Sequence, residues 1–135
     1  MSNKKFLVCE HCGNFVGVIK DSGVPMICCG QPMTVLNANT VDASVEKHTP
    51  VVSVDGNKVI ATVGSVEHPM VDVHYIEWIY VETNKGGQRK ALNPGEAPKA
   101  EFVMAVGEVA KAVYAYCAGC WPDWKTDYAG YWPGC

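Results

Sequence analysis

The 135-residue sequence lacks several features that would assign it to a common class. It has no apolar run approaching the roughly 20 residues that a membrane-spanning helix needs. It also has no basic excess, because 11 basic residues face 14 acidic ones. We therefore expect neither a nucleic-acid nor a membrane partner. The first residues, MSNKKFLVCEHC, contain no apolar segment of signal-peptide length, which predicts a cytoplasmic protein.

Helical periodicity is also nearly absent. Short apolar runs broken by glycine, proline and asparagine dominate, and this pattern is typical of an all-β chain. The length allows one domain, or one domain with a small appendage. We expect an antiparallel β-sandwich whose strands cover residues 51–54, 58–63, 73–81, 88–92, 100–106 and 111–116. Our candidates for its core are Ile76, Trp78, Phe102, Met104 and Val113.

Cysteine is plentiful, with seven residues in a small chain that we expect in the cytosol. Metal binding explains such a content better than disulfides do, and the odd number argues against complete pairing. Cys9 and Cys12 form the motif CEHC, and Cys28 and Cys29 are adjacent in ICCGQPM. Two thiolates from each of two tight turns can enclose a tetrahedral ion. The ligand type alone does not decide whether this ion is iron or zinc.

The residues around these cysteines fit a small metal module. Gly13 and Gly30 each follow a cysteine pair, where the backbone must turn sharply and amides can point at sulfur. His11 lies between two cysteines, and we expect it to face solvent. The segment is too short to bury a proper core, so the ion would hold it together.

A second candidate site lies in the stretch VEHPMVDVHYIEW. Pro69 favours an extended conformation at His68, and His74 leads into a run that predicts a strand. We therefore expect His68 at a strand edge or corner, where its side chain can face a metal. The alternative is two ordinary histidines, one in a turn and one half-buried.

A third histidine, His48, follows Glu46 and Lys47 and lies close to Pro50. By themselves the two charged residues would be interpreted as a solvated pair on a loop.

These motifs carry a resemblance to a known family. The C-x-x-C motif followed by an adjacent C-C pair resembles the desulforedoxin module, an iron site with four cysteine ligands. The motifs EKH, EHPM, HYIEW and YC that follow make the chain similar to desulfoferrodoxin, the two-iron superoxide reductase, over roughly residues 1–117. The resemblance implies a rubredoxin-like metal module at residues 1–36. It further implies an immunoglobulin-like sandwich domain at residues 37–135, with an atypical tail from residue 118, and a homodimer.

The resemblance also implies a second iron with four equatorial histidines and one axial cysteine. Matching the motifs makes His48, His68 and His74 equatorial ligands and Cys117 the axial one. Cys120 stands where the family has its remaining histidine. In the first alternative, Cys120 is a fifth ligand. In the second, the site lacks one ligand, and it then binds iron weakly or binds zinc instead. A disulfide between Cys117 and Cys120 under oxidation is the third alternative.

The implied activity is the one-electron reduction of superoxide to hydrogen peroxide without release of oxygen. In the family, the residue matching Lys47 steers superoxide, and the one matching Glu46 is the sixth ligand of the resting ferric iron. A small redox carrier such as rubredoxin would supply electrons.

Two alternatives remain open from the sequence. One is a non-catalytic iron electron-transfer protein with a degenerate second site, and the other is a zinc-stabilised interaction module. The aromatic tail WPDWKTDYAGYWPGC either caps the metal site or a dimer surface, or is loosely held.

Overall fold

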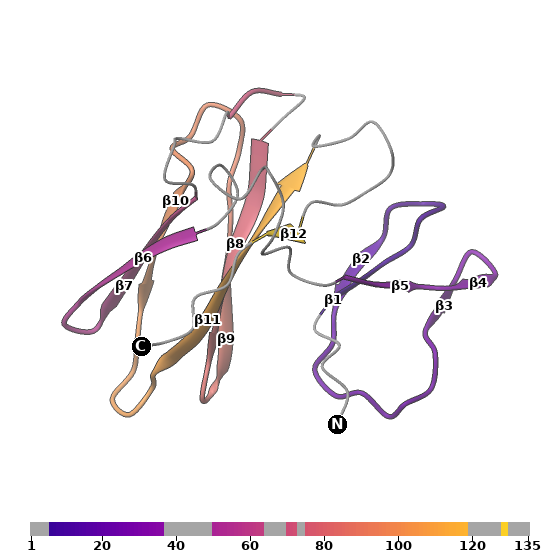
Figure 1. The fold of residues 1–135 in the computed structure, drawn as a ribbon, viewed down its shortest axis with the longest axis horizontal. Helices are drawn as coiled ribbons and strands as arrows, with labels where there is room; N and C mark the ends of the chain where they lie inside the picture. The colour runs from indigo at the N-terminus through magenta and orange to yellow at the C-terminus, as the bar shows by residue number, and fades with distance from the viewer. Residues whose placement is uncertain (1–5, 37–49, 64–69, 73–74, 119–127, 130–135) are drawn as a thin grey trace. The chain divides into compact units, whose positions relative to one another are not determined.

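The computed structural model describes residues 6–36, 50–63, 70–72, 75–118 and 128–129. The chain divides into two compact units, Met1–Asn37 and Ala38–Cys135, which we call the cysteine module and the sandwich. Every regular element among the described residues is a β-strand, so the all-β prediction is confirmed (Figure 1). Nothing in those residues forms a helix of the length and apolarity that crossing a membrane requires.

The cysteine module is built around β1 (Phe6–Val8). This strand lies between β2 (Phe15–Gly17) and β5 (Thr34–Leu36), both antiparallel to it. A separate two-stranded hairpin joins β3 (Ile27–Cys28) to β4 (Gln31–Pro32). All three residues of the central strand are buried.

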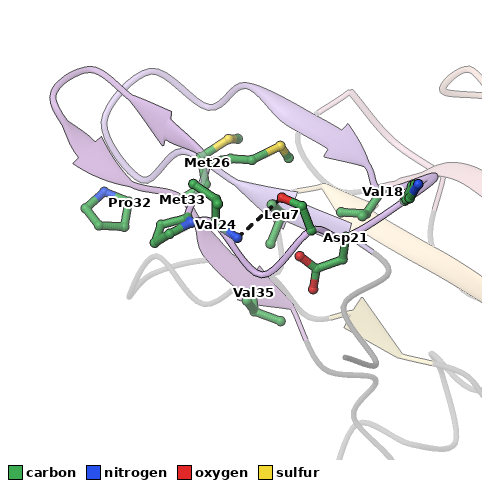
Figure 2. A pocket seen from close by; sticks show the side chains of 11 residues that line it. Leu7, Val18, Asp21, Val24, Met26, Pro32, Met33 and Val35 are labelled. Carbon is green, nitrogen blue, oxygen red and sulfur yellow. Dashed lines mark hydrogen bonds between the residues drawn. The ribbon is translucent and has the colours of Figure 1, made fainter. Parts of the chain in front are cut away.

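The module has little core beyond that strand. Among its described residues, the buried apolar side chains are Phe6, Leu7, Val8 and Cys9. Beside them lies a cavity of about 340 Å³, which Figure 2 shows with Leu7, Val24, Met26 and Met33 around it. A unit of this size with so few buried side chains needs a further source of stability.

The sandwich consists of two antiparallel sheets. One has the order β10-β7-β6 and the other the order β12-β11-β8-β9. The strands are β6 (Pro50–Asp55), β7 (Lys58–Val63), β8 (Tyr75–Thr83), β9 (Gly86–Ala91), β10 (Lys99–Val103), β11 (Ala110–Ala118) and β12 (Tyr128–Ala129). The chain forms the β6–β7 hairpin in one sheet and the β8–β9 hairpin in the other. It then returns to pair β10 with β7 and β11 with β8, which is immunoglobulin-like connectivity.

Both sheets contribute to one hydrophobic core. Its members come from β7, β8, β10 and β11 and from the loops that follow β9 and β10: Val59, Ala61, Val63, Ile76, Ile79, Val81, Leu92, Ala100, Phe102, Met104, Ala110, Val113 and Ala115. All five predicted core residues are buried. Trp78, however, is not part of this cluster and stacks on Tyr116, with ring centroids 5.7 Å apart.

A β-bulge explains the position of Trp78. In the β8–β11 ladder, Tyr116 pairs with Trp78 but Cys117 pairs with Ile76, so Glu77 is an extra residue. The extra residue resets the alternation of side chains along the strand. Ile76 and Ile79 can therefore both reach the core.

Most strand boundaries differ from the prediction by one or two residues, and the end of β10 differs by three. Strand β9 begins at Gly86, so Gly86 and Gly87 belong to the strand and not to the turn. A Cβ at position 87 would collide with the Tyr80 ring, so glycine here makes room for a cross-strand neighbour. Strand β10 ends at Val103 and not at residue 106. The N–H of Ala105 donates to the Glu108 carboxylate (3.1 Å) and so is not used for strand pairing.

Part of the aromatic tail is paired with the sheet. Tyr128 and Ala129 form β12, opposite Tyr116 and Ala115 of β11. The alternative of a loosely held tail is therefore wrong for these two residues.

Candidate metal centres

The first cysteine pair lies in a tight turn directly after β1. The N–H of Gly13 donates to the carbonyl of Cys9 (2.8 Å), and the N–H of Cys9 donates to the carbonyl of Asn14 (2.8 Å). Gly13 has a φ of +83°, a conformation that favours glycine. This turn brings Cys12 back beside Cys9, and the N–H of Cys12 donates to the Cys9 sulfur at 3.4 Å.

The second pair lies in the hairpin between β3 and β4. Cys28 pairs with Gln31, so Cys29 and Gly30 are the two central residues of the turn. Both have positive φ, +53° and +75°, as a type I′ turn requires. Glycine adopts this conformation freely, whereas Cys29 is the one non-glycine residue with positive φ in the described part of the chain.

The structure brings these four cysteines together. Their Sγ atoms all lie within 4.8 Å of one another, and those of Cys12 and Cys28 are 3.6 Å apart. Four sulfurs around a tetrahedral ion at 2.3 Å are about 3.8 Å apart, so the spacing suits iron or zinc. All four cysteines are free thiols.

The electrostatics of the cluster favour a cation. The backbone N–H of Cys12, with a smaller contribution from that of His11, lowers the pKa of Cys9 to about 6. Hydrogen bonds with Cys12 and Cys9 raise the pKa of Cys28, and they raise the pKa of Cys29 to about 12. The Cys9 thiolate therefore forms easily while Cys28 and Cys29 favour the protonated form, and a bound metal ion would favour the thiolate form of its ligands.

The cluster lies at the surface of the module. Cys9 is buried and Cys28 half-buried, but Cys12 and Cys29 are exposed. His11 is exposed, as expected. Asn14 donates from Nδ2 to the Cys28 sulfur (3.6 Å), a contact that the sequence analysis missed. Its only signal in the sequence is its place directly after CEHCG.

Most of the predicted second site lies outside the described residues. This applies to Glu46, Lys47, His48, His68, His74 and Cys120. Among the predicted ligands of this second site, Cys117 is the one whose backbone the structure describes. It lies in β11 and pairs with Ile76 in β8.

The described strands nevertheless show where the strand ends next to these residues in sequence lie. Pro50, at the start of β6, pairs with Val63 at the end of β7, and Tyr75, at the start of β8, pairs with Ala118 at the end of β11. The β6–β7 turn, the β8–β9 turn and the β10–β11 loop lie together at the opposite end, where Met104 donates to Asn57. In Figure 1, β11 ends and β8 begins at the same end of the sandwich. The strand ends that adjoin His48, His68, His74 and Cys117 in sequence thus share that end.

The fold and the four-thiolate cluster define an all-β protein with a small metal module ahead of an immunoglobulin-like sandwich. Two family models match the sequence. Desulfoferrodoxin, N-terminal domain, matches residues 3–36, and Desulfoferrodoxin matches residues 40–123. The chain belongs to the desulfoferrodoxin family.

Relatives cover most of the chain. A desulfoferrodoxin homolog of Archaeoglobus fulgidus is 45% identical over 113 residues, 84% of this chain and 90% of that protein. The desulfoferrodoxin of Nitratidesulfovibrio vulgaris is 42% identical with the same coverage. The crystal structure of the superoxide reductase from Treponema pallidum is similar with a TM-score of 0.71 and 33% identity, over 84% of this chain and 89% of that one. Strand β12 lies beyond the residues that the family models match.

Proposed function

We propose that this protein is a superoxide reductase, which converts superoxide to hydrogen peroxide without releasing oxygen. One observation carries the proposal: in a chain of the desulfoferrodoxin family, the strand ends next to His48, His68, His74 and Cys117 share one end of the sandwich. His48 precedes Pro50 by two residues and His74 directly precedes Tyr75. Because two residues of chain span at most about 7 Å, these imidazoles can converge there.

The proposed site holds iron through three imidazoles and the Cys117 thiolate, with Cys120 as a further ligand. When bound, ferrous iron supplies the electron and a position open to a small anion. The net reaction takes up one electron and two protons per superoxide to give hydrogen peroxide. Imidazole ligands are neutral, so ferrous iron with Cys117 as its one thiolate would keep a net positive charge that attracts superoxide, whereas a second thiolate from Cys120 would cancel that charge.

Each protein group in this proposal has a distinct role. The Cys117 thiolate would help to hold the iron and, as a ligand, would donate electron density that favours reduction of the substrate. The ammonium of Lys47 attracts superoxide and orients the water that protonates it. Glu46 would supply a carboxylate ligand to the iron in its oxidised form, as the matching residue does in the family. A second thiolate from Cys120 would lower the reduction potential of the site.

The surface cysteine cluster, loaded with iron, is a place where a small redox protein such as rubredoxin can deliver electrons. Cys12 and Cys29 are exposed there. By family resemblance we expect a cytoplasmic homodimer.

Metal analysis combined with visible absorption tests the function. A ferric four-thiolate centre should absorb strongly, and a separate ferric histidine–thiolate band should shift when azide is added. Superoxide should be consumed without oxygen release. A coloured protein with no azide-sensitive band would instead be an electron-transfer protein, and a colourless zinc protein would be an interaction module.

The substitution Lys47→Ala tests the steering role. Losing this cation should slow the second-order reaction with superoxide by about tenfold at low salt, because an electrostatically guided encounter is weakened. The difference from the wild type should shrink as salt screens the charge. Stopped-flow kinetics at several ionic strengths measures both effects.

Lys111→Ala is the matched control. Lys111 is an exposed lysine at the start of β11, the opposite end of that strand from Cys117. Its loss changes the net charge equally and should barely affect the rate. Equal rates for Lys47→Ala and the wild type at low salt would contradict the steering role.

A further inference from the structure

Asn14 links the two turns that carry the cysteine pairs. It follows the first turn, where its carbonyl accepts the N–H of Cys9 (2.8 Å). Its side chain reaches the second turn, where Nδ2 donates to the sulfur of Cys28 (3.6 Å). The backbone bond fixes the base of this side chain, and strand β2 (Phe15–Gly17) begins at the next residue. One residue therefore contacts a cysteine from each turn.

Two sulfurs of the cluster receive different kinds of donor. The backbone N–H of Cys12 donates to the Cys9 sulfur (3.4 Å), and this bond is a property of the turn itself. The donor to the Cys28 sulfur is a side-chain amide. A substitution can remove a side-chain donor while the backbone of both turns stays as it is. The environment of the Cys28 sulfur therefore depends on which residue follows the first turn.

A donor at this position matters most when the sulfur is charged. A neutral thiol is a weak acceptor, whereas hydrogen bonds to an ionised acceptor are about twice as strong as neutral ones. With four thiolates, a ferric ion gives a centre with one net negative charge, and a ferrous ion gives a centre with two. The Asn14 amide therefore stabilises the ferrous form more. Hydrogen bonds to the sulfurs are among the factors that set the reduction potential of iron–sulfur centres.

We propose that Asn14 is a positioning residue of the four-cysteine centre, which raises the reduction potential of its iron by donating to the Cys28 sulfur. The inference rests on iron in this cluster, as in the proposed function, and does not depend on the second site. Asn14 acts through Cys28 and is not a ligand itself. A higher potential makes the centre easier to reduce by an external electron donor.

Asn14→Leu tests the role, with Gln31→Leu as its matched control. Each change replaces an exposed side-chain amide by leucine and leaves the net charge as it is. Gln31 lies in β4 and pairs with Cys28 through the backbone. Within the described residues, the side-chain amide that donates to the Cys28 sulfur is that of Asn14 and not that of Gln31. A general effect of a new apolar side chain beside the cluster should therefore appear in both variants.

The measurement is a redox titration of the iron-loaded full chain, followed through the visible band of the ferric four-thiolate centre. Water can replace part of the lost amide at this exposed site, so we expect a modest change. The ferric-to-ferrous ratio of Asn14→Leu at a given poise should rise about threefold, which lowers the midpoint by about 28 mV at about 59 mV per tenfold change. The ferric band should also move to longer wavelength, because a sulfur without the donor gives electron density to iron more easily. Gln31→Leu should match the wild type in both readouts.

Asn14→Gln keeps an amide on a longer side chain and should recover part of the shift. If Asn14→Leu does not retain iron, Asn14→Ser removes the same amide donor with a smaller change at the surface. A midpoint of the variant without the amide that equals that of Gln31→Leu would overturn the role of Asn14, as would Gln being no better than Leu. A wild-type protein without a ferric four-thiolate band would overturn it as well, before any variant is made. The proposed function fails on a different observation, a missing azide-sensitive band.

Discussion

The two units of the chain are stabilised in different ways. Among the described residues of the cysteine module, the buried apolar side chains are four neighbours in sequence, Phe6–Cys9, beside a cavity of about 340 Å³. The sandwich has a core to which both of its sheets contribute. Its fully buried side chains include Phe102, Ile76, Ile79 and Val113.

This difference indicates what a metal ion does in each unit. In the described part of the module, four thiols converge where no sizeable core exists, so we expect metal binding and folding to be one event. In the sandwich, the core folds the strands first and thereby brings the flanks of the proposed second site to one end. We therefore expect the first ion to be mainly a structural requirement, and the proposed second ion to be held by a scaffold that exists without it.

Removing the metal from the module should have the largest effect. Cys9→Ser leaves three thiols, and the module should unfold, because a structural metal contributes about 10–16 kcal/mol in comparable sites. The sandwich should stay folded. Amide resonances of β1 (Phe6–Val8) should collapse to random-coil positions while those of β8 (Tyr75–Thr83) keep their dispersion.

His11→Ala is the control for this experiment. His11 lies between two of the cysteines and is exposed, so the module should keep its fold and its metal. If β8 lost its dispersion together with β1 in Cys9→Ser, the two units would not be independent in stability.

Truncating the core of the sandwich should have the second-largest effect. Phe102→Ala empties a fully buried position and should lower the free energy of unfolding by about 3–5 kcal/mol. Urea unfolding followed by tryptophan fluorescence measures the loss. Val103→Ala, the exposed next residue, should be nearly neutral. Bleaching of the four-thiolate band at the lowered urea midpoint would contradict the separation of the two units.

The sequence predicted the features that depend on local patterns. Two cysteine pairs at tight turns predicted the cluster because ligand spacing and glycine placement are local. Short apolar runs between turn residues predicted the six main strands and the burial of Ile76, Phe102 and Val113 for the same reason. A family resemblance then supplied the immunoglobulin-like class of the sandwich.

Features that depend on contacts between distant residues were missed. Glu77 is a bulge only because β11 has one residue fewer at that point, which the sequence of β8 alone does not reveal. Gly87 belongs to a strand because Tyr80 lies against it. Met70 belonged to a recognised motif, but its contacts with Ile76 and Gly95 depend on how loops close over the sandwich.

The smallest expected effect concerns the end of the sandwich that lies away from the proposed iron site. There, side-chain hydrogen bonds of Glu108 connect the ends of the strands. The Glu108 carboxylate accepts the Thr83 hydroxyl (2.7 Å) and the Ala105 N–H (3.1 Å). These two bonds, led by the one from Thr83, lower the pKa of Glu108. The charged form is therefore favoured in the folded state, which links stability to pH.

The sign of this linkage is fixed by the direction of the shift. A depressed pKa stabilises the fold above the unfolded value of about 4.3 and loses that contribution as pH falls through the folded value. Glu108→Gln should lower the urea midpoint slightly at neutral pH, and its difference from the wild type should shrink in acid below about pH 4. Glu101→Gln removes a carboxylate from surface ion pairs with Lys58 (3.8 Å) and Lys99 (4.0 Å), so it controls for general charge effects. A Glu108→Gln difference that stays constant down to acid pH would mean that the Glu108 contacts stabilise this end through shape and not through charge.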